Sequence, residues 1–202
     1  WNYWSNTGAI NGHTVGELSD KYANLFTPAG YAFAIWGLIF LGLLVLVGSQ
    51  LRMAFGDGAD SETILQIGPW LTIANLGNAA WLWFWLHEDI GVSVLIMLVI
   101  LFSLMRIVLR LNMERWDAPG ALIATVWWPI CVYSGWIAVA TIANVSAWLA
   151  SLQWSAVFSE VQWTVIMIGV AGLLNLVVLQ MRNMREFASV GMWAIAAIAV
   201  KH

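Results

Sequence analysis

The stretch IGVSVLIMLVILFSLMRIVLR, residues 90–110, decides the fold class of this chain. It has no ionisable side chain before Arg106, and about 20 apolar residues are enough for an α-helix to cross a bilayer. A helix satisfies its own backbone hydrogen bonds, which makes it the default structure for such a stretch inside a membrane. The sequence therefore predicts a transmembrane helix at about 90–110.

The composition of the whole chain agrees with a membrane protein. Of the 202 residues, 61% are hydrophobic and only 9% are charged, whereas soluble domains have about 25% charged residues. The net charge of −3 offers no basic surface for nucleic acid, so no nucleic-acid partner is expected. Cys131 is the only cysteine, which excludes an internal disulfide.

Apolar stretches of similar length occur on both sides of residues 90–110. Pro28 and Pro119 stand just ahead of two of them, at positions that favour the start of a helix. Residues 1–29 are mostly polar and are predicted to form an extramembrane loop. The chain is thus predicted to be an all-α, polytopic transmembrane helix bundle. Its predicted spans are about 30–51, 67–86, 90–110, 120–150, 162–181 and 187–202.

The basic residues indicate how this bundle is oriented. If the spans alternate in direction, only Lys21 and Lys201 lie on the face that holds the loop 1–29. Cytoplasmic loops of membrane proteins are enriched in Lys and Arg, so the opposite face is predicted to be cytoplasmic. The residues on that face are Arg52, Arg106, Arg110, Arg115, Arg182 and Arg185.

The sequence offers no residues for catalysis or metal binding. It contains no phosphate-binding Gly loop, no nucleophile elbow and no zinc-ligand spacing. His13, His87 and His202 are scattered, and the run at 87–89 (HED) is typical of an exposed turn, since metal ligands must converge on one ion. We therefore expect no catalytic residue, no metal site and no enzymatic activity.

Uncharged polar and aromatic residues remain as candidates for a binding site. Asn78 and Trp81, three residues apart, share one helix face, and Trp136, Ala140 and Asn144 follow one another at four-residue steps along another. An Asn within hydrocarbon must find a partner, so each Asn either joins two helices or contacts a ligand. Two such faces on different spans favour a shared aromatic pocket, while the role in joining helices stays open for each Asn.

Three stretches in this order and separation resemble the TspO/MBR family, the tryptophan-rich sensory proteins and translocator proteins. They are TPAGYAFAIW at 27–36, NAAW at 78–81 and WIAVATIANVSAW at 136–148. The resemblance covers about residues 20–150, with 30–150 expected to form the TspO-like core. Residues 151–202 have no counterpart in this pattern and are expected to supply two additional transmembrane helices to a divergent family member.

The resemblance also implies a number of helices and a type of ligand. Family members have five helices, and the first precedes the proline segment, so that helix is expected to be missing before Trp1. The family binds porphyrins and other tetrapyrroles, and sterols in animals. Here the resemblance implies a sensor, carrier or regulator that binds haem, protoporphyrin, a chlorophyll-type pigment or a lipid. The residues that match the family pattern are Pro28, Trp36, Asn78, Trp81, Trp136, Ala140 and Asn144.

A structural or accessory subunit of a larger membrane complex, including a pigment–protein complex, is the alternative function. The predicted spans 162–181 and 187–202, rich in apolar residues, would supply surface for lipids, a second copy or other subunits. A small-molecule transporter fits less well, because the chain shows neither an internal repeat nor a coupling charge within its spans.

Overall fold

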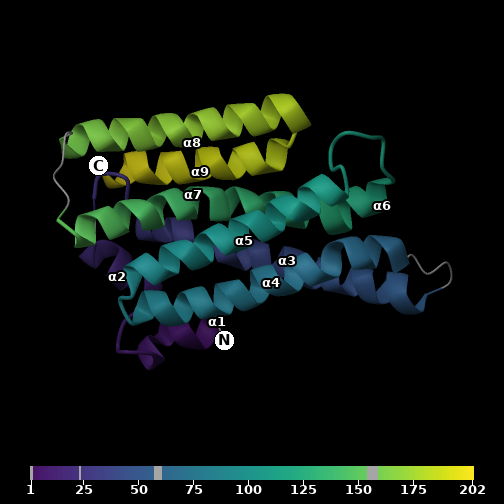
Figure 1. The fold of residues 1–202 in the computed structure, drawn as a ribbon, viewed down its shortest axis with the longest axis horizontal. Coiled ribbons are helices and arrows are strands. Elements are labelled where there is room, and N and C mark those ends of the chain that lie inside the picture. Colours follow the sequence, from purple (N-terminus) through teal and green to yellow (C-terminus); the bar gives the residue numbers. More distant parts are fainter. Residues whose placement is uncertain (1, 23, 57–60, 154–158) are drawn as a thin grey trace.

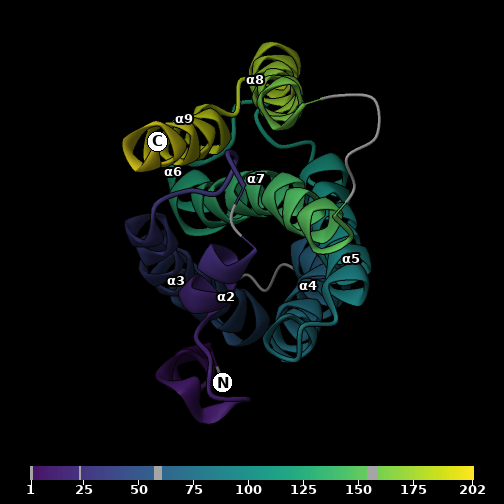
Figure 2. The same ribbon diagram turned by 90° about the vertical axis from the view of Figure 1, so that its left-hand side faces the viewer.

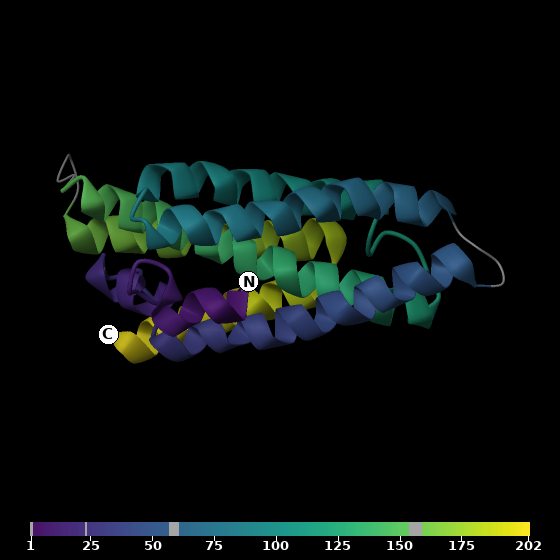
Figure 3. The ribbon, with the colours of Figure 1, turned by 90° about the horizontal axis from the view of Figure 1, so that it is seen from below.

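The computed structural model describes residues 2–22, 24–56, 61–153 and 159–202, and within these ranges all regular structure is helical. Figure 1 shows long helices lying side by side along one axis, with the chain reversing direction at the two ends. Figure 3 gives the same picture from below. The predicted all-α polytopic helix bundle is confirmed.

Six long helices overlap the six predicted spans. Short helical segments precede or separate them, which include the 3₁₀-helical turn Gly30–Ala34 in the proline segment and a π-helical turn at Ile123–Trp127 ahead of Pro129. The other short segments are α1 (Asn2–Trp4), a π-helical turn (Ser5–Ala9), α2 (Val15–Lys21) and α6 (Gly120–Leu122). The long helices are α3 (Ile35–Phe55), α4 (Ser61–Leu86), α5 (Ile90–Arg110), α7 (Trp128–Ser151), α8 (Glu160–Arg182) and α9 (Arg185–Lys201).

Four helical segments of the described ranges are long and apolar enough to cross a membrane: Gly30–Phe55, Ile90–Arg110, Gly120–Ser151 and Glu160–Arg182. Helix α9, with 17 residues, is shorter than the roughly 20 that a straight span needs. Helix α4 is long enough, but Thr, Asn and Gln dilute its apolar character. An integral membrane protein follows from these segments, while spanning by α4 and α9 stays a prediction.

Several of the long helices lie around the interior of the bundle, and the short helix α2 lies across one end of this interior. In the end-on view of Figure 2, α3, α4, α5 and α7 lie around this interior, α9 lies beside α7, and α8 is outermost. Helix α5 packs against both α4 and α7, whereas α3 packs mainly on α7 and touches α4 only slightly. Helix α8 packs on α9 and, to a smaller extent, on α7. At its C-terminal end, Met181 O accepts a hydrogen bond from Arg115 in the loop after α5.

Residues 1–29, predicted as a loop, contain two short helices and a π-helical turn. Helix α2 begins with a capping box: Thr14 Oγ1 accepts a hydrogen bond from the Glu17 backbone N–H, and Glu17 Oε2 accepts one from the Thr14 N–H. The Thr-x-x-Glu spacing is a known signature of a helix start, so this helix was readable from the sequence. Whether the segment lies outside the membrane stays a prediction.

The last helix, α9, lies against the proline segment at the other end of the chain. The backbone N–H of Ala29 donates to Ala197 O at 3.0 Å, and Trp193 Nε1 donates to Ala32 O at 3.3 Å. Residues about 165 positions apart are therefore neighbours. This contact fixes the start of α3 beside α7 and α9.

Candidate functional site: an aromatic cavity beneath α2

A cavity of about 50 Å³ lies inside the bundle, at the end that α2 covers. Its lining is mainly apolar and aromatic, and it comes from α2, the proline segment, α3, α4, α5 and α7. The lining residues are Val15, Ser19, Thr27, Pro28, Phe33, Trp36, Trp81, Trp85, Met97, Trp136, Val139, Ala140, Ala143, Asn144 and Ala147.

A buried polar network forms part of the wall of this cavity. Trp81 Nε1 on α4 donates a 2.7 Å hydrogen bond to Asn144 Oδ1 on α7. Asn144 Nδ2 donates to Ser93 Oγ on α5 at 2.8 Å, and the Ser93 hydroxyl donates to Ile90 O at 2.7 Å. All three side chains are buried. Because the network links three helices and satisfies its polar atoms, it fixes the orientation of Trp81.

The aromatic rings around the cavity support one another in pairs. Trp81 and Trp85, four residues apart on α4, stack with ring centroids 5.7 Å apart and planes 20° from parallel. Trp136 meets Phe33 edge to face at 5.9 Å, and Trp36 lies at 6.0 Å from the Tyr133 ring. Flat, preorganised aromatic faces suit a flat apolar ligand.

A second cavity, of about 270 Å³, adjoins the first between α2, α3 and α4. Val15, Phe33, Trp36 and Trp81 line both cavities. The volumes of the two cavities together just reach the lower end of the range of about 300–1,000 Å³ that is typical of small-molecule sites.

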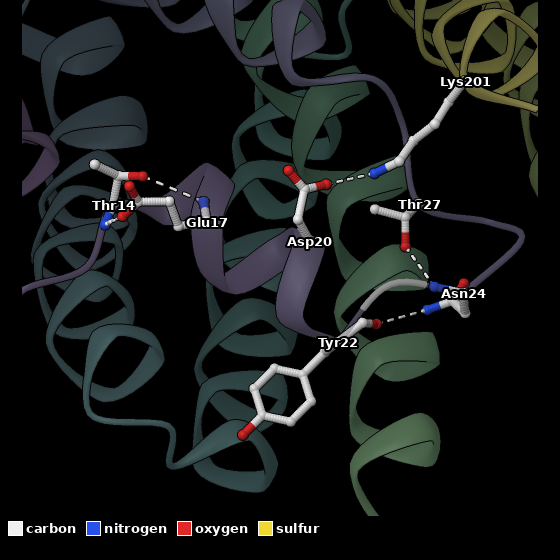
Figure 4. Close-up of polar contacts among 7 residues, drawn as sticks. All are labelled: Thr14, Glu17, Asp20, Tyr22, Asn24, Thr27 and Lys201. Atoms are coloured by element: carbon white, nitrogen blue, oxygen red, sulfur yellow. Dashed lines mark hydrogen bonds and ion pairs between the residues drawn. The ribbon is translucent and has the colours of Figure 1, made fainter.

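Hydrogen bonds and ion pairs hold α2 over the cavity. Trp85 Nε1 donates to Val15 O at 3.4 Å, and Asn11 Nδ2 donates to Leu86 O at 3.0 Å. At the C-terminal end of α2, Asp20 Oδ1 forms an ion pair with Lys201 Nζ of α9 at 2.5 Å (Figure 4). Figure 4 also shows Asn24 in the segment between α2 and the proline segment, where it makes hydrogen bonds to its neighbours in the chain. Its N–H donates to Thr27 Oγ1 at 2.9 Å.

Glu88, in the turn between α4 and α5, is the main anchor for the end of α2. Lys21 Nζ contacts Glu88 Oε2 at 2.5 Å, and the Tyr22 hydroxyl donates to the same oxygen. Hydrogen bonds from Lys21 and then Tyr22 hold the pKa of Glu88 below its ordinary value. The hydrogen bond to Glu88 raises the pKa of Tyr22 to about 12, with burial as the second cause. At neutral pH both pKa shifts favour an ionised Glu88 carboxylate that accepts a hydrogen bond from a protonated Tyr22 hydroxyl.

Glu88 keeps this role at a cost in backbone energy. Its φ of 65° lies in the left-handed region, which glycine adopts readily and other residues adopt at a cost of about 1 kcal/mol or more. A carboxylate at this position therefore indicates that its contacts to Lys21 and Tyr22 offset the strain.

The structure gathers all but one of the sequence-predicted binding residues around the cavity. Pro28, Trp36, Trp81, Trp136, Ala140 and Asn144 line it. Asn78 does not line it; it is buried, and its Oδ1 has no hydrogen-bond partner among the described residues. Because Asn78 is three residues before Trp81, it lies on a neighbouring part of the α4 surface. Binding of a ligand by these residues stays a prediction.

Several lining residues were not singled out from the sequence. Trp85 and Ala147 each follow a named residue, Trp81 or Asn144, by about one helical turn, so helical spacing could have found them. Val15, Ser19 and Met97 had no such signal, because they come from α2 and α5. Only the tertiary structure places these two elements against the cavity.

The described part of the chain contains no cluster of three or more His, Cys, Asp or Glu side chains that could hold a metal ion. The absence of a metal site and of enzymatic activity stays a prediction for the whole protein.

The fold and the cavity define a polytopic α-helical membrane protein with an aromatic interior site beneath a short covering helix. A family model described as TSPO-like protein matches residues 1–202, and the chain belongs to this family. Neither the curated proteins nor the solved structures gave a match. The family match covers the residues of α8 and α9 as well, beyond the three short motifs that carry the resemblance. The division into a core at 30–150 and two additional helices stays a prediction.

Proposed function

We propose that this TspO-like membrane protein binds a flat hydrophobic ligand, a tetrapyrrole or a lipid of similar shape, in the aromatic cavity beneath α2. The observation that supports this most is the convergence of Trp36, Trp81, Trp85 and Trp136 on one interior space. A buried indole contributes large apolar contact area at low entropic cost. The protein then acts as a sensor, carrier or regulator of that ligand.

The size of the cavity implies that α2 moves when a ligand binds. A space of about 50 Å³ is well below the volume of a small-molecule site. Movement of Val15 and Ser19 away from the bundle would join this space to the adjoining 270 Å³ cavity. The ligand would then lie between Trp81 and the rings of Phe33 and Trp36, with Asn144 at its polar edge.

The lining favours a metal-free tetrapyrrole over haem. The residues around the cavity include no imidazole and no thiol, and the soft donor among them is the thioether of Met97. Haem iron is usually held by His, Cys or a His–Met pair. The macrocycle of protoporphyrin carries no metal that needs a ligand, so it can pack on the aromatic faces that are present.

The binding experiment is a titration of the purified protein in detergent with protoporphyrin IX, followed by the shift of its Soret absorption. Trp136→Ala and Trp81→Ala each remove a face of the cavity and should weaken binding about tenfold or more, because stacking on an aromatic side chain contributes roughly 1–3 kcal/mol. Trp83→Ala is the matched control, since Trp83 is an exposed residue of the same helix outside the cavity. Equal affinity of all three variants would reject the cavity as the binding site.

We infer further that the end of the bundle with the arginines faces the cytoplasm. Arg52, Arg110 and Arg182 lie in the last turns of α3, α5 and α8, and these helix ends meet at one end in Figure 1. Lys21 and Lys201 lie at the other end, with α2. An excess of Lys and Arg is typical of cytoplasmic loops. The test is to place a single cysteine at this end with Asn112→Cys in a Cys131→Ser background and to treat right-side-out vesicles with an impermeant maleimide. Labelling should occur only after the vesicles are permeabilised.

A subunit of a larger membrane complex is the second candidate, and helix α8 favours it. One side of this helix is exposed, at Val161, Val165, Val170, Leu173, Leu176, Val177 and Met181. That side is free to meet lipid or another chain, whereas Met167, Ile168, Leu174 and Val178 pack against the core. A homodimer would use the same surface. Purification in a mild detergent distinguishes these outcomes: additional copurifying subunits support the complex, and a lone monomer would count against it.

A further inference from the structure

A second feature lies at the arginine end of the bundle, on the outer seam between α4 and α5. Phe102, Arg106 and Arg110 follow one another at four-residue steps, so they form one stripe on α5. All three contact the ring of Trp70 on α4. Phe102 meets it edge to face at 5.8 Å, and the guanidinium carbons of Arg106 and Arg110 lie 5.4 and 5.6 Å from its centroid.

The two guanidiniums have no counter-charge in the described part of the protein. No carboxylate there lies within ion-pair distance of Arg106 or Arg110, and Arg106 Nε is covered without finding a hydrogen-bond acceptor. The Trp70 ring attracts both cations and so holds them together, but it does not neutralise them. Two adjacent positive charges at the border of the hydrocarbon are costly unless an anion joins them.

The surface next to these cations is apolar and exposed. Ile73, one turn after Trp70 on α4, is 41% exposed, and Leu98, one turn before Phe102 on α5, is 47% exposed. Because α4 and α5 are antiparallel, both residues lie on the same side of Trp70, away from the guanidiniums. The seam thus presents two cations followed by an apolar track toward the middle of the bundle.

We propose that Trp70, Arg106 and Arg110 form a binding site for the phosphate of an anionic phospholipid, whose acyl chains lie along Phe102, Leu98 and Ile73. Guanidinium groups match phosphate oxygens in pairs and are the preferred phosphate ligands among side chains. The apolar track selects a lipid over free phosphate. This site is separate from the cavity beneath α2, since Trp70 and Trp81 are roughly 16 Å apart along α4 at 1.5 Å per residue.

Native mass spectrometry of the purified protein, titrated with phosphatidylglycerol or phosphatidylcholine of identical acyl chains, tests the proposal. The wild-type protein should retain a phosphatidylglycerol molecule at lower lipid concentration than phosphatidylcholine. Arg106→Gln with Arg110→Gln should weaken this retention about tenfold or more, since each basic residue near an anionic headgroup contributes about 1 kcal/mol. The matched control, Arg52→Gln with Arg185→Gln, removes two charges from the same end and should leave retention unchanged.

Further variants and a competitor distinguish a specific lipid site from general surface charge and from binding of phosphate alone. Arg110→Gln alone removes an exposed side chain, keeps the fold intact and should still weaken retention several-fold. Trp70→Leu keeps both charges and should also weaken it. Equal loss in the Arg106/Arg110 and Arg52/Arg185 pairs would overturn the site in favour of general surface charge. Full displacement of the lipid by inorganic phosphate at equal concentration would overturn the role of the acyl track.

Discussion

The indole Nε1 of Trp81 lies 2.7 Å from Oδ1 of Asn144 and donates a hydrogen bond to it inside the bundle. This bond joins α4 to α7 across the wall of the aromatic cavity. Asn144 therefore links two helices and also borders the cavity, while contact of Asn144 with a ligand stays a prediction. The same side chain thus connects α4, α5 and α7 through its hydrogen bonds and forms part of the cavity wall.

Trp81→Phe should destabilise the protein modestly while keeping the cavity apolar. The variant removes the N–H donor to Asn144 Oδ1. The Ser93 hydroxyl lies 3.3 Å from this oxygen but has a single proton, which it donates to Ile90 O at 2.7 Å. Hydrogen bonds between membrane helices contribute about 0.6 kcal/mol on average and up to about 1.7 kcal/mol. Unfolding in detergent, followed by circular dichroism, measures the loss. Trp83→Phe, on the exposed face of α4, should show no comparable effect.

The double variant Trp81→Phe/Asn144→Leu should be less destabilised than the sum of the two single variants. Asn144→Leu alone leaves the Trp81 N–H and the Ser93 hydroxyl without their interhelical partner, and a buried unpaired donor costs about 1–3 kcal/mol. Removal of both members of the bond avoids part of this cost. A double-mutant cycle from chemical denaturation gives the coupling energy. Strict additivity would mean that the bond does not form in the membrane-like environment.

Glu88→Gln should loosen α2 and speed the exchange of ligand with the cavity. The substitution removes the negative charge that Lys21 and the Tyr22 hydroxyl contact. Hydrogen–deuterium exchange of the backbone amides of residues 15–22 measures the loosening, and stopped-flow mixing with protoporphyrin measures the association rate. The adjacent Asp89→Asn is the control, because the Asp89 side chain makes no capping hydrogen bond. Unchanged exchange in the Glu88 variant would show that α2 is held by its other contacts.

The contacts of Glu88 with Lys21 and Tyr22 also predict how the attachment of α2 depends on pH. Because the pKa of Glu88 is lowered, its stabilising contribution is complete above the ordinary value of 4.5 and is lost as the pH falls through the lower folded-state value. Because the pKa of Tyr22 is raised to about 12, its contribution is complete below 10 and is lost as the pH rises through about 12. Proteolysis of the segment 1–29 should therefore stay slow and constant between about pH 5 and 9. A marked rise in cleavage between pH 7 and 6 would contradict this assignment.

Two glycines with opposite surroundings test how α9 packs. A Cβ built at Gly135 of α7 would lie 2.9 Å from the carbonyl oxygen of Phe187 and 3.1 Å from its Cα. Because these are backbone atoms of α9, Gly135→Ala should force the helices apart and cost about 1–3 kcal/mol. Gly172 of α8 has no atom within 4 Å of such a Cβ. Gly172→Ala should be neutral or stabilising by up to about 1 kcal/mol, as thermal unfolding would show.

The helical bundle and the approximate bounds of its long helices follow from the sequence alone. In a bilayer, an apolar stretch such as residues 90–110 must satisfy its backbone hydrogen bonds internally, and it does so as an α-helix. The four-residue steps of Trp136, Ala140 and Asn144 likewise place these side chains on one face, because helix geometry is local. The capping box at Thr14 and Glu17 belongs to the same local information.

Which helices face one another was decided only by tertiary packing. No periodicity places Lys201 beside Asp20, brings Met97 of α5 to the cavity, or leaves Asn78 outside it. Such pairings depend on close approaches at single residues, such as Gly135 against Phe187, and on the fit of whole helix surfaces. In a membrane these contacts are set by packing and hydrogen bonds rather than by hydrophobic pattern, since lipid and protein interiors are equally apolar. The sequence therefore determined the helices of this protein and many residues that line its aromatic cavity, and the tertiary structure decided how α2 covers that cavity and how α9 packs beside it.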